Sequence, residues 1–223
     1  MKLSEEMKNK TLLSFELFPP KTEKGLQNLP GTIDHLMKYN PSYISCTYGA
    51  GGGNVGANRE VCQMIKNAGT TPVTHFTVIK NTKEGIKEQL DQYLADGVDH
   101  MLALRGDIPL GETTTCGDFD YATDLVKFVR DTYGDKFEIA VAGSPEGHIS
   151  CRSLESDIAV LKQKQDNGAD YIMTQLCWDM EQFKYWLDAI RKAGITMPVD
   201  VGVMPILDQA ATINMALSRN GCV

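Results

Sequence analysis

Two acidic residues lie near the ends of predicted strands and could take part in acid–base chemistry. Glu16 has only apolar neighbours along the chain, and burial among such residues raises the pKa of a carboxyl group toward that of a useful proton donor. Asp107 follows an apolar run, Met101 to Leu104, that is typical of a strand buried on both faces. Asp107 is therefore either a second functional acid or the salt-bridge partner of Arg105.

Several other predicted strands also end in polar side chains. In a barrel of parallel strands the carboxyl ends meet at one rim, so these side chains are predicted to form a polar ring there. By residue type, His75 is more often a core histidine than a ligand. Gln175 lies in an apolar segment and needs a hydrogen-bond partner if it is buried. The ring comprises Glu16, Thr47, Tyr48, His75, Arg105, Gly106, Asp107, Ser144, Glu146, His148 and Gln175.

A glycine-rich segment, residues 49–56, follows the second predicted strand. It contains a formal GxGxxG pattern at Gly51, Gly53 and Gly56, the spacing of a dinucleotide-binding turn. The pattern follows the second strand, and no acid ends the third strand to hold a ribose. A loop over the mouth of a barrel is therefore favoured over a Rossmann-type dehydrogenase.

The elements that must position these residues alternate strictly between strand and helix. Predicted strands cover residues 12–20, 43–49, 72–77, 101–104, 138–144, 171–177 and 199–205. Predicted helices cover 30–39, 57–68, 82–96, 121–133, 153–167, 180–193 and 208–219. Such alternation indicates a parallel sheet with right-handed crossovers. We expect an α/β fold, a (β/α)8 TIM barrel of which about seven βα units are present. It forms one domain, 1–223, that ends where an eighth strand would begin.

Composition excludes several classes of protein. The net charge is −7 and no basic run occurs, which argues against a nucleic-acid partner. No apolar run reaches the roughly 18 residues of a membrane span, and the polar N-terminus is not a signal peptide. The six cysteines form no CxxC pair and the four histidines no HxxxH pattern, so we expect free thiols, no metal site and a cytoplasmic location.

Six segments together resemble the methylenetetrahydrofolate reductase family, with their order and spacing maintained over residues 12–219. The segments are SFELFPP at 14–20, SCTYGA at 45–50, TH at 74–75, ALRGDIP at 103–109, PEGH at 145–148 and TQ at 174–175. The resemblance implies an oxidoreductase in which NAD(P)H reduces bound FAD. The flavin then reduces 5,10-methylenetetrahydrofolate to 5-methyltetrahydrofolate.

The resemblance also implies roles for particular residues. Glu16 matches the family's acid, which protonates N10 of the folate. Asp107 matches the aspartate near flavin and pterin, whose charge tunes the flavin and favours a cationic intermediate. Gln175 matches the glutamine that binds folate and nicotinamide, and Gln209 lies near the folate. Cofactor-binding positions are Thr47, Tyr48, Ala50, His75, Arg105, Gly106, Asp107, Tyr121, Ala122, Ser144, His148, Asp157 and Lys164, with Lys164 toward the pyrophosphate.

Four positions depart from the family pattern and leave alternatives open; one of them, Gln209, stands near where an aromatic residue often packs against the bound ligand. Ser144 replaces an expected tyrosine beside the flavin, and Val160 and Gln163 replace polar or basic groups that help to hold FAD. One alternative is therefore a flavin-free reductase of the same substrate, and another is a non-catalytic barrel subunit that docks onto a partner. The expected partners are a small-molecule folate and either a second copy of the chain or a partner reductase subunit.

Overall fold

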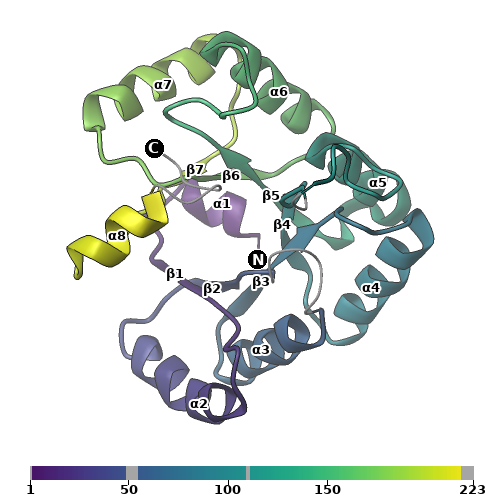
Figure 1. Cartoon of the computed structure of the whole chain (residues 1–223), viewed down its shortest axis with the longest axis vertical. Helices are drawn as coiled ribbons and strands as arrows, with labels where there is room; N and C mark the ends of the chain where they lie inside the picture. The colour runs from purple at the N-terminus through teal and green to yellow at the C-terminus, as the bar shows by residue number, and fades with distance from the viewer. Residues whose placement is uncertain (1, 49–54, 109–110, 217–223) are drawn as a thin grey trace.

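The fold is a curved sheet of seven parallel strands, seen in a computed structural model that describes residues 2–48, 55–108 and 111–216. The strands follow one another across the sheet in chain order (Figure 1). They are β1 (Ser14–Leu17), β2 (Tyr43–Cys46), β3 (Thr71–Thr77), β4 (His100–Leu104), β5 (Glu138–Gly143), β6 (Tyr171–Thr174) and β7 (Val199–Asp200). This is a TIM-barrel-like α/β fold with seven βα units, as the sequence predicted.

Each strand is followed by a helix, and α2 to α7 lie around the outside of the sheet (Figure 1). The helices are α2 (Glu23–Met37), α3 (Val55–Asn67), α4 (Lys83–Ala95), α5 (Ala122–Tyr133), α6 (Leu154–Asp166), α7 (Met180–Lys192) and α8 (Gln209–Ala216). Side chains of Thr22, Thr82, Ser153 and Asp179 accept backbone N–H groups at the starts of α2, α4, α6 and α7. These caps satisfy donors that would otherwise have no partner.

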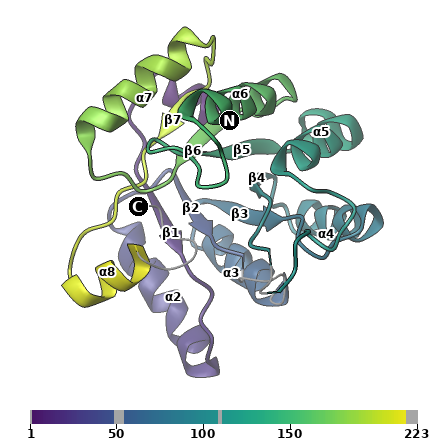
Figure 2. The same cartoon turned by 45° about the horizontal axis from the view of Figure 1, so that its top comes forward.

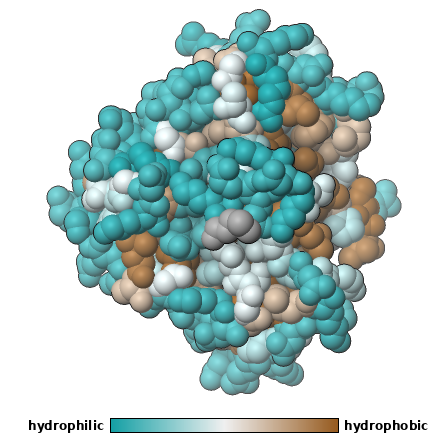
Figure 3. All heavy atoms as spheres, turned by 180° about the vertical axis from the view of Figure 1, so that it is seen from behind, coloured by the Kyte–Doolittle hydropathy of each residue, from teal (hydrophilic) through white to brown (hydrophobic). Residues whose placement is uncertain are grey.

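Alternation along the strands divides the core into two parts. Outward-facing side chains such as Ile44, Phe76 and Ile172 pack with the helices into one large cluster. Inward-facing side chains form a smaller cluster inside the curve of the sheet, made of Leu3, Tyr43, Val73, Leu102, Ala140 and Tyr171. The period of two in a strand explains why neighbours in sequence enter different clusters. Seen from behind, much of the outer surface is hydrophilic (Figure 3).

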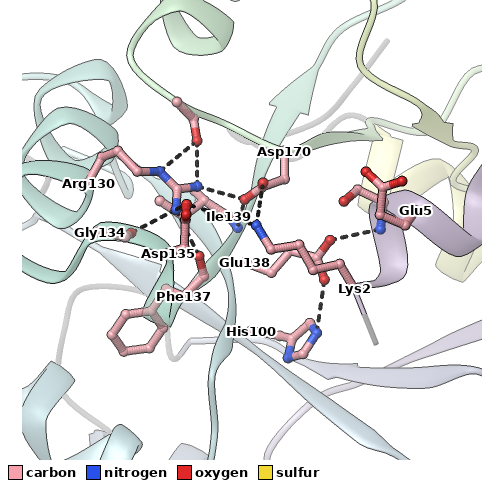
Figure 4. Close-up of polar contacts among 12 residues, drawn as sticks. Lys2, Glu5, His100, Arg130, Gly134, Asp135, Phe137, Glu138, Ile139 and Asp170 are labelled. Carbon is pink, nitrogen blue, oxygen red and sulfur yellow. Dashed lines mark hydrogen bonds and ion pairs between the residues drawn. The ribbon is translucent and has the colours of Figure 1, made fainter.

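A short N-terminal helix, α1 (Leu3–Met7), closes the amino end of the sheet. The buried carboxylate of Glu138, the first residue of β5, accepts the backbone N–H groups of Leu3 at 2.7 Å and Ser4 at 2.8 Å. His100 lies 2.9 Å from the same carboxylate (Figure 4). Burial raises the pKa of Glu138, but hydrogen bonds from His100, Ser4 and Leu3 outweigh it and lower the pKa to about 2.

Ion pairs beside α1 extend the same network. Arg130 of α5 donates to Asp170, 2.7 Å away, and to the carbonyl of Gly168, while Lys2 lies 3.5 Å from Asp170 (Figure 4). Asp170 in turn accepts the backbone N–H of Ile139 in β5. This polar network therefore ties helix α1, strand β5 and the start of β6 together at the amino end.

The structure corrects several predicted boundaries. Helix α2 begins at Glu23 and runs through Pro30, whereas the sequence predicted a start at residue 30 from the apolar positions Ile33, Leu36 and Met37. Strand β6 ends at Thr174, so Gln175 is not inside a strand, and it is exposed rather than buried. Helix α1 was not predicted, because its five residues show no helical period of their own.

Strands β1 and β7 form the two edges of the described sheet. Helix α8 lies between α7 and α2 on this side of the molecule in both views (Figures 1 and 2). Several apolar side chains here remain exposed, among them Val203 and Leu207. Among the described residues, no helix has the length and apolar character needed to cross a membrane.

Candidate functional site

The site begins inside the sheet, where Glu16 of β1 and His75 of β3 face each other. His75 Nε2 lies 3.8 Å from Glu16 Oε2. The His75 side chain is buried, while 46% of the Glu16 side chain stays exposed toward the open end. From the sequence, these residues were predicted only to lie at the ends of two strands. The parallel register of β1, β2 and β3 makes them neighbours.

The electrostatic surroundings favour neutral forms of both groups. Partial burial raises the pKa of Glu16, and the charge of Asp200 raises it further. Burial lowers the pKa of His75 to about 4, so the imidazole is neutral at pH 7 and offers no positive charge to Glu16. Glu16 is thus suited to hold a proton and give it to a bound base.

Two buried polar atoms on β3 have no hydrogen-bond partner among the described residues. They are His75 Nε2 and Thr77 Oγ1. An unpaired polar atom in a protein interior is costly, and a functional site is one place where such atoms occur. Both atoms lie toward the carboxyl end of the strand, where barrel enzymes bind their ligands.

The turn after β4 presents Arg105, Gly106 and Asp107. Gly106 has a positive φ of 86°, and a Cβ there would lie 3.0 Å from Thr77 Cβ and 3.2 Å from Ile79 Cβ. Only glycine meets both conditions without strain. Arg105 donates through Nε to the Gly106 carbonyl at 3.3 Å, and Asp107 is exposed.

Basic groups gather beside this turn. Lys164 of α6 donates to the carbonyl of Ala142 at 3.0 Å, near the end of β5, and burial lowers its pKa. Asp157 of the same helix accepts the backbone N–H of His148 at 3.3 Å. Partial burial lowers the pKa of His148, Asp157 opposes the shift, and the charges of Arg105 and Lys164 add to it. The predicted residues Arg105, His148, Asp157 and Lys164 therefore share one electrostatic neighbourhood.

Other predicted residues lie farther from this neighbourhood or contribute differently. Tyr48 is buried against Phe76, and its hydroxyl donates to Gln89 of α4 at 3.0 Å, so this side chain anchors the outer layer. Tyr121 is 61% exposed and precedes Ala122, the first residue of α5. Gln209 begins α8 and is exposed. Ala50 and most of the glycine-rich segment lie outside the described residues.

Thr47, Ser144 and Gln175 each directly follow a strand, whereas the sequence predicted them within the last residues of longer strands. The N–H of Thr47 donates to the carbonyl of Leu17, and that of Gln175 donates to the carbonyl of Gly143. Ser144 is half-buried, and its carbonyl accepts the N–H of Gly147 in a turn. These three residues therefore hold the ends of β2, β5 and β6 in line with their neighbours.

Sequence reasoning missed two polar groups that organise the site. Asn58 of α3 is fully buried and donates to the carbonyls of Cys46 and Thr47, while its Oδ1 accepts Thr74 and Tyr93 hydroxyls. Asp200 of β7 accepts the Tyr43 and Ser14 hydroxyls. A charged residue between two valines in a predicted strand was the available signal for Asp200.

Comparison with known proteins places this arrangement in a family. A family model described as methylenetetrahydrofolate reductase matches residues 2–219. The chain belongs to the methylenetetrahydrofolate reductase family. It is 38% identical over 219 residues to methylenetetrahydrofolate reductase (NADH) 1 of Arabidopsis thaliana. This alignment covers 92% of this chain and 37% of the plant protein. It is 34% identical over 202 residues to 5,10-methylenetetrahydrofolate reductase of Escherichia coli, covering 90% of this chain and 67% of that protein.

The chain thus spans little more than a third of the plant reductase and about two thirds of the bacterial one. Among solved structures, an uncharacterized protein from Clostridium thermocellum that binds two copies of 5-methyl-5,6,7,8-tetrahydrofolic acid superposes with a TM-score of 0.66. The match covers 95% of this chain and 72% of that protein, at 14% identity. A 2,3-dimethylmalate lyase gives a TM-score of 0.60 at 11% identity, with 95% of this chain and 81% of the lyase covered. At such identities these structures support the fold of this reductase-family chain.

Proposed function

We propose that this chain reduces 5,10-methylenetetrahydrofolate to 5-methyltetrahydrofolate, with NAD(P)H as reductant and FAD as the bound flavin. The observation that carries the proposal is Glu16, which has a raised pKa and faces a neutral His75 inside the sheet of a reductase-family chain. The Clostridium thermocellum neighbour binds a methyltetrahydrofolate on the same fold, which supports a folate as substrate class.

In this proposal Glu16 supplies the proton that opens the five-membered ring of the folate. The raised pKa favours the protonated carboxyl group, which would donate to N10. Ring opening leaves an iminium cation at N5, whose methylene carbon would accept hydride and become the methyl group. Exposure of 46% of the Glu16 side chain leaves room for a substrate to reach it from the carboxyl end.

The residues at the carboxyl ends of β3, β4 and β5 fit FAD. Arg105 and Lys164 supply positive charge suited to a diphosphate, and His148, whose lowered pKa favours the neutral imidazole, lies in the same neighbourhood. Gly106 permits close backbone approach, and the unpaired Thr77 Oγ1 and His75 Nε2 await a polar partner. Bound FAD would supply hydride transfer between nicotinamide and folate. Thr47, Tyr121, Ala122, Ser144 and Asp157 complete the proposed cofactor set, in which Tyr48 and Ala50 would contribute through the backbone.

Asp107 and Gln175 are proposed to face the substrate. Both are exposed and follow the ends of β4 and β6, so they lie at the rim that also carries Arg105. The carboxylate of Asp107 would favour the cation at N5 by Coulomb attraction, and the Gln175 amide would bind the pterin. Gln209 would approach the substrate from α8.

The experiment that tests the proposal combines a cofactor titration with an assay. Flavin absorption bands that titrate to saturation with added FAD, and NAD(P)H-dependent formation of methyltetrahydrofolate, would support it. Folate reduction without flavin binding would favour the flavin-free alternative, in keeping with Val160 and Gln163, which are exposed on α6. A folded chain that binds neither FAD nor folate would contradict the proposal. A cytoplasmic location and self-association, or association with a partner subunit, stay predictions.

A further inference from the structure

Asp200 is a second carboxylate inside the sheet, close to the proposed proton donor. It ends β7, and its register partner on β6 is Met173, which packs with the inward-facing cluster. Strands β1 and β7 are the two edges of the described sheet, and the Asp200 side chain bridges from β7 to β1 and β2. There it accepts the hydroxyl of Tyr43 on β2 and, at 3.4 Å, the hydroxyl of Ser14 on β1.

This placement brings two carboxylates to one wall of the interior. Ser14 and Glu16 are two residues apart on β1 and therefore share a face of the strand. Ser14 pairs in register with Tyr43, and Glu16 pairs with Ser45. Both hydroxyl donors to Asp200 therefore lie two residues along their strands from the Glu16–Ser45 pair. We propose that Asp200 is a positioning residue that keeps the proton on Glu16 by holding a fixed negative charge beside it.

The two carboxyl groups differ in their hydrogen-bond partners. Asp200 accepts the hydroxyl groups of Tyr43 and Ser14, which hold its carboxylate in place. Among the described residues, Glu16 has one polar neighbour of this kind, His75 at 3.8 Å, beyond hydrogen-bond length. The charge of Asp200 repels a second negative charge on Glu16 and so raises the pKa of Glu16.

The other titratable groups that face Glu16 are neutral near pH 7. Tyr43 on β2 has its pKa raised, first by burial and then by the charge of Asp200. His75 on β3 has its pKa lowered to about 4 by burial. Asp200 on β7 is therefore the charged group that acts on Glu16 among the described residues of these strands.

The inference rests on the proposed function for its catalytic meaning, but its test does not need catalysis. The direct measurement is a titration of carboxyl carbons by NMR in chains labelled with ¹³C at glutamate, with Glu16→Gln to assign the Glu16 signal. In the unaltered chain Glu16 should titrate well above the exposed glutamates. An ordinary midpoint would overturn the inference even if every variant failed to fold.

Asp200→Asn removes the charge and keeps an oxygen that Tyr43 and Ser14 can donate to. We expect the Glu16 midpoint to fall, and folate reduction above that midpoint to fall roughly threefold to tenfold, with the acid-requiring limb moved to lower pH. Asp188→Asn, which removes an exposed charge on α7, is the matched control. It should change neither the Glu16 midpoint nor folate reduction.

The outcomes separate the two claims. If the Glu16 midpoint falls in Asp200→Asn while the unaltered chain reduces no folate, the electrostatic role of Asp200 stands and the proposed function fails. If folate is reduced but the midpoint and the pH profile stay the same in Asp200→Asn, the proposed function stands and the role of Asp200 is overturned.

Discussion

At the scale of single residues, chemistry depends on groups whose surroundings set their protonation state. Glu16 and His75 lie 3.8 Å apart, yet burial keeps His75 neutral and raises the pKa of Glu16. An acid beside a neutral imidazole differs from an ion pair, because neither group holds the other in its charged form. The interior face of β1 and β3 can therefore hold a proton on Glu16 and give it to a bound base.

Gly106 offers a test of how tightly the proposed cofactor turn is built. Gly106→Ala would add a Cβ 3.0 Å from Thr77 and 3.2 Å from Ile79 at a positive φ. We expect a loss of about 2–4 kcal/mol in the free energy of unfolding, measured by urea denaturation. Gly111→Ala is the matched control, since Gly111 also has a positive φ but open space around it. Equal losses in the two variants would show that packing at Gly106 adds nothing.

At the scale of elements, helix α1 shows how a segment without its own helical signal is held by tertiary contacts. Its first N–H groups are accepted by Glu138 of β5, and Leu3 packs with the inward-facing cluster. His100 of β4 lies 2.9 Å from the same oxygen of Glu138 that accepts the N–H of Leu3. Strands β4 and β5 therefore carry a charged pair at the amino end, away from the proposed site.

The pair predicts how stability depends on pH. Burial lowers the pKa of His100, but Asp99 and Glu138 outweigh it and raise the pKa to about 9, so its stabilisation is complete below 6.5 and is lost as the pH rises toward 9. Glu138, lowered to about 2, contributes above 4.5 and loses its contribution as the pH falls toward 2. Urea denaturation should show greatest stability between pH 4.5 and 6.5.

Replacing the histidine tests the alkaline limb. His100→Asn should remove most of the decline between pH 6.5 and 9, on the order of 2–3 kcal/mol. His35→Asn, on the exposed surface of α2, is the control and should leave the decline in place. An unchanged decline in His100→Asn would assign it to another group.

At the scale of the whole molecule, alternation of strands and helices was enough to predict seven parallel βα units. It also predicted Glu16, Arg105 and Gln175 at strand ends, because strand length and order decide which residues reach the rim. Helix α1 and Asp200 depend on partners far away in sequence, such as Glu138 and Tyr43. The local sequence pattern predicts neither the burial of Tyr48 nor the exposure of Gln175. Tyr48 is buried because it packs toward α4, and Gln175 is exposed because β6 ends at Thr174.

The most direct test of the central claim is the Glu16→Gln variant assayed for two half-reactions. Folate reduction should fall by about 100-fold or more, because the amide cannot supply the proton. Oxidation of NAD(P)H with an artificial acceptor should stay near that of the unaltered chain, as should both activities in the control Glu181→Gln, whose side chain is 84% exposed on α7. Equal loss of both half-reactions, or undiminished folate reduction, would contradict Glu16 as the proton donor.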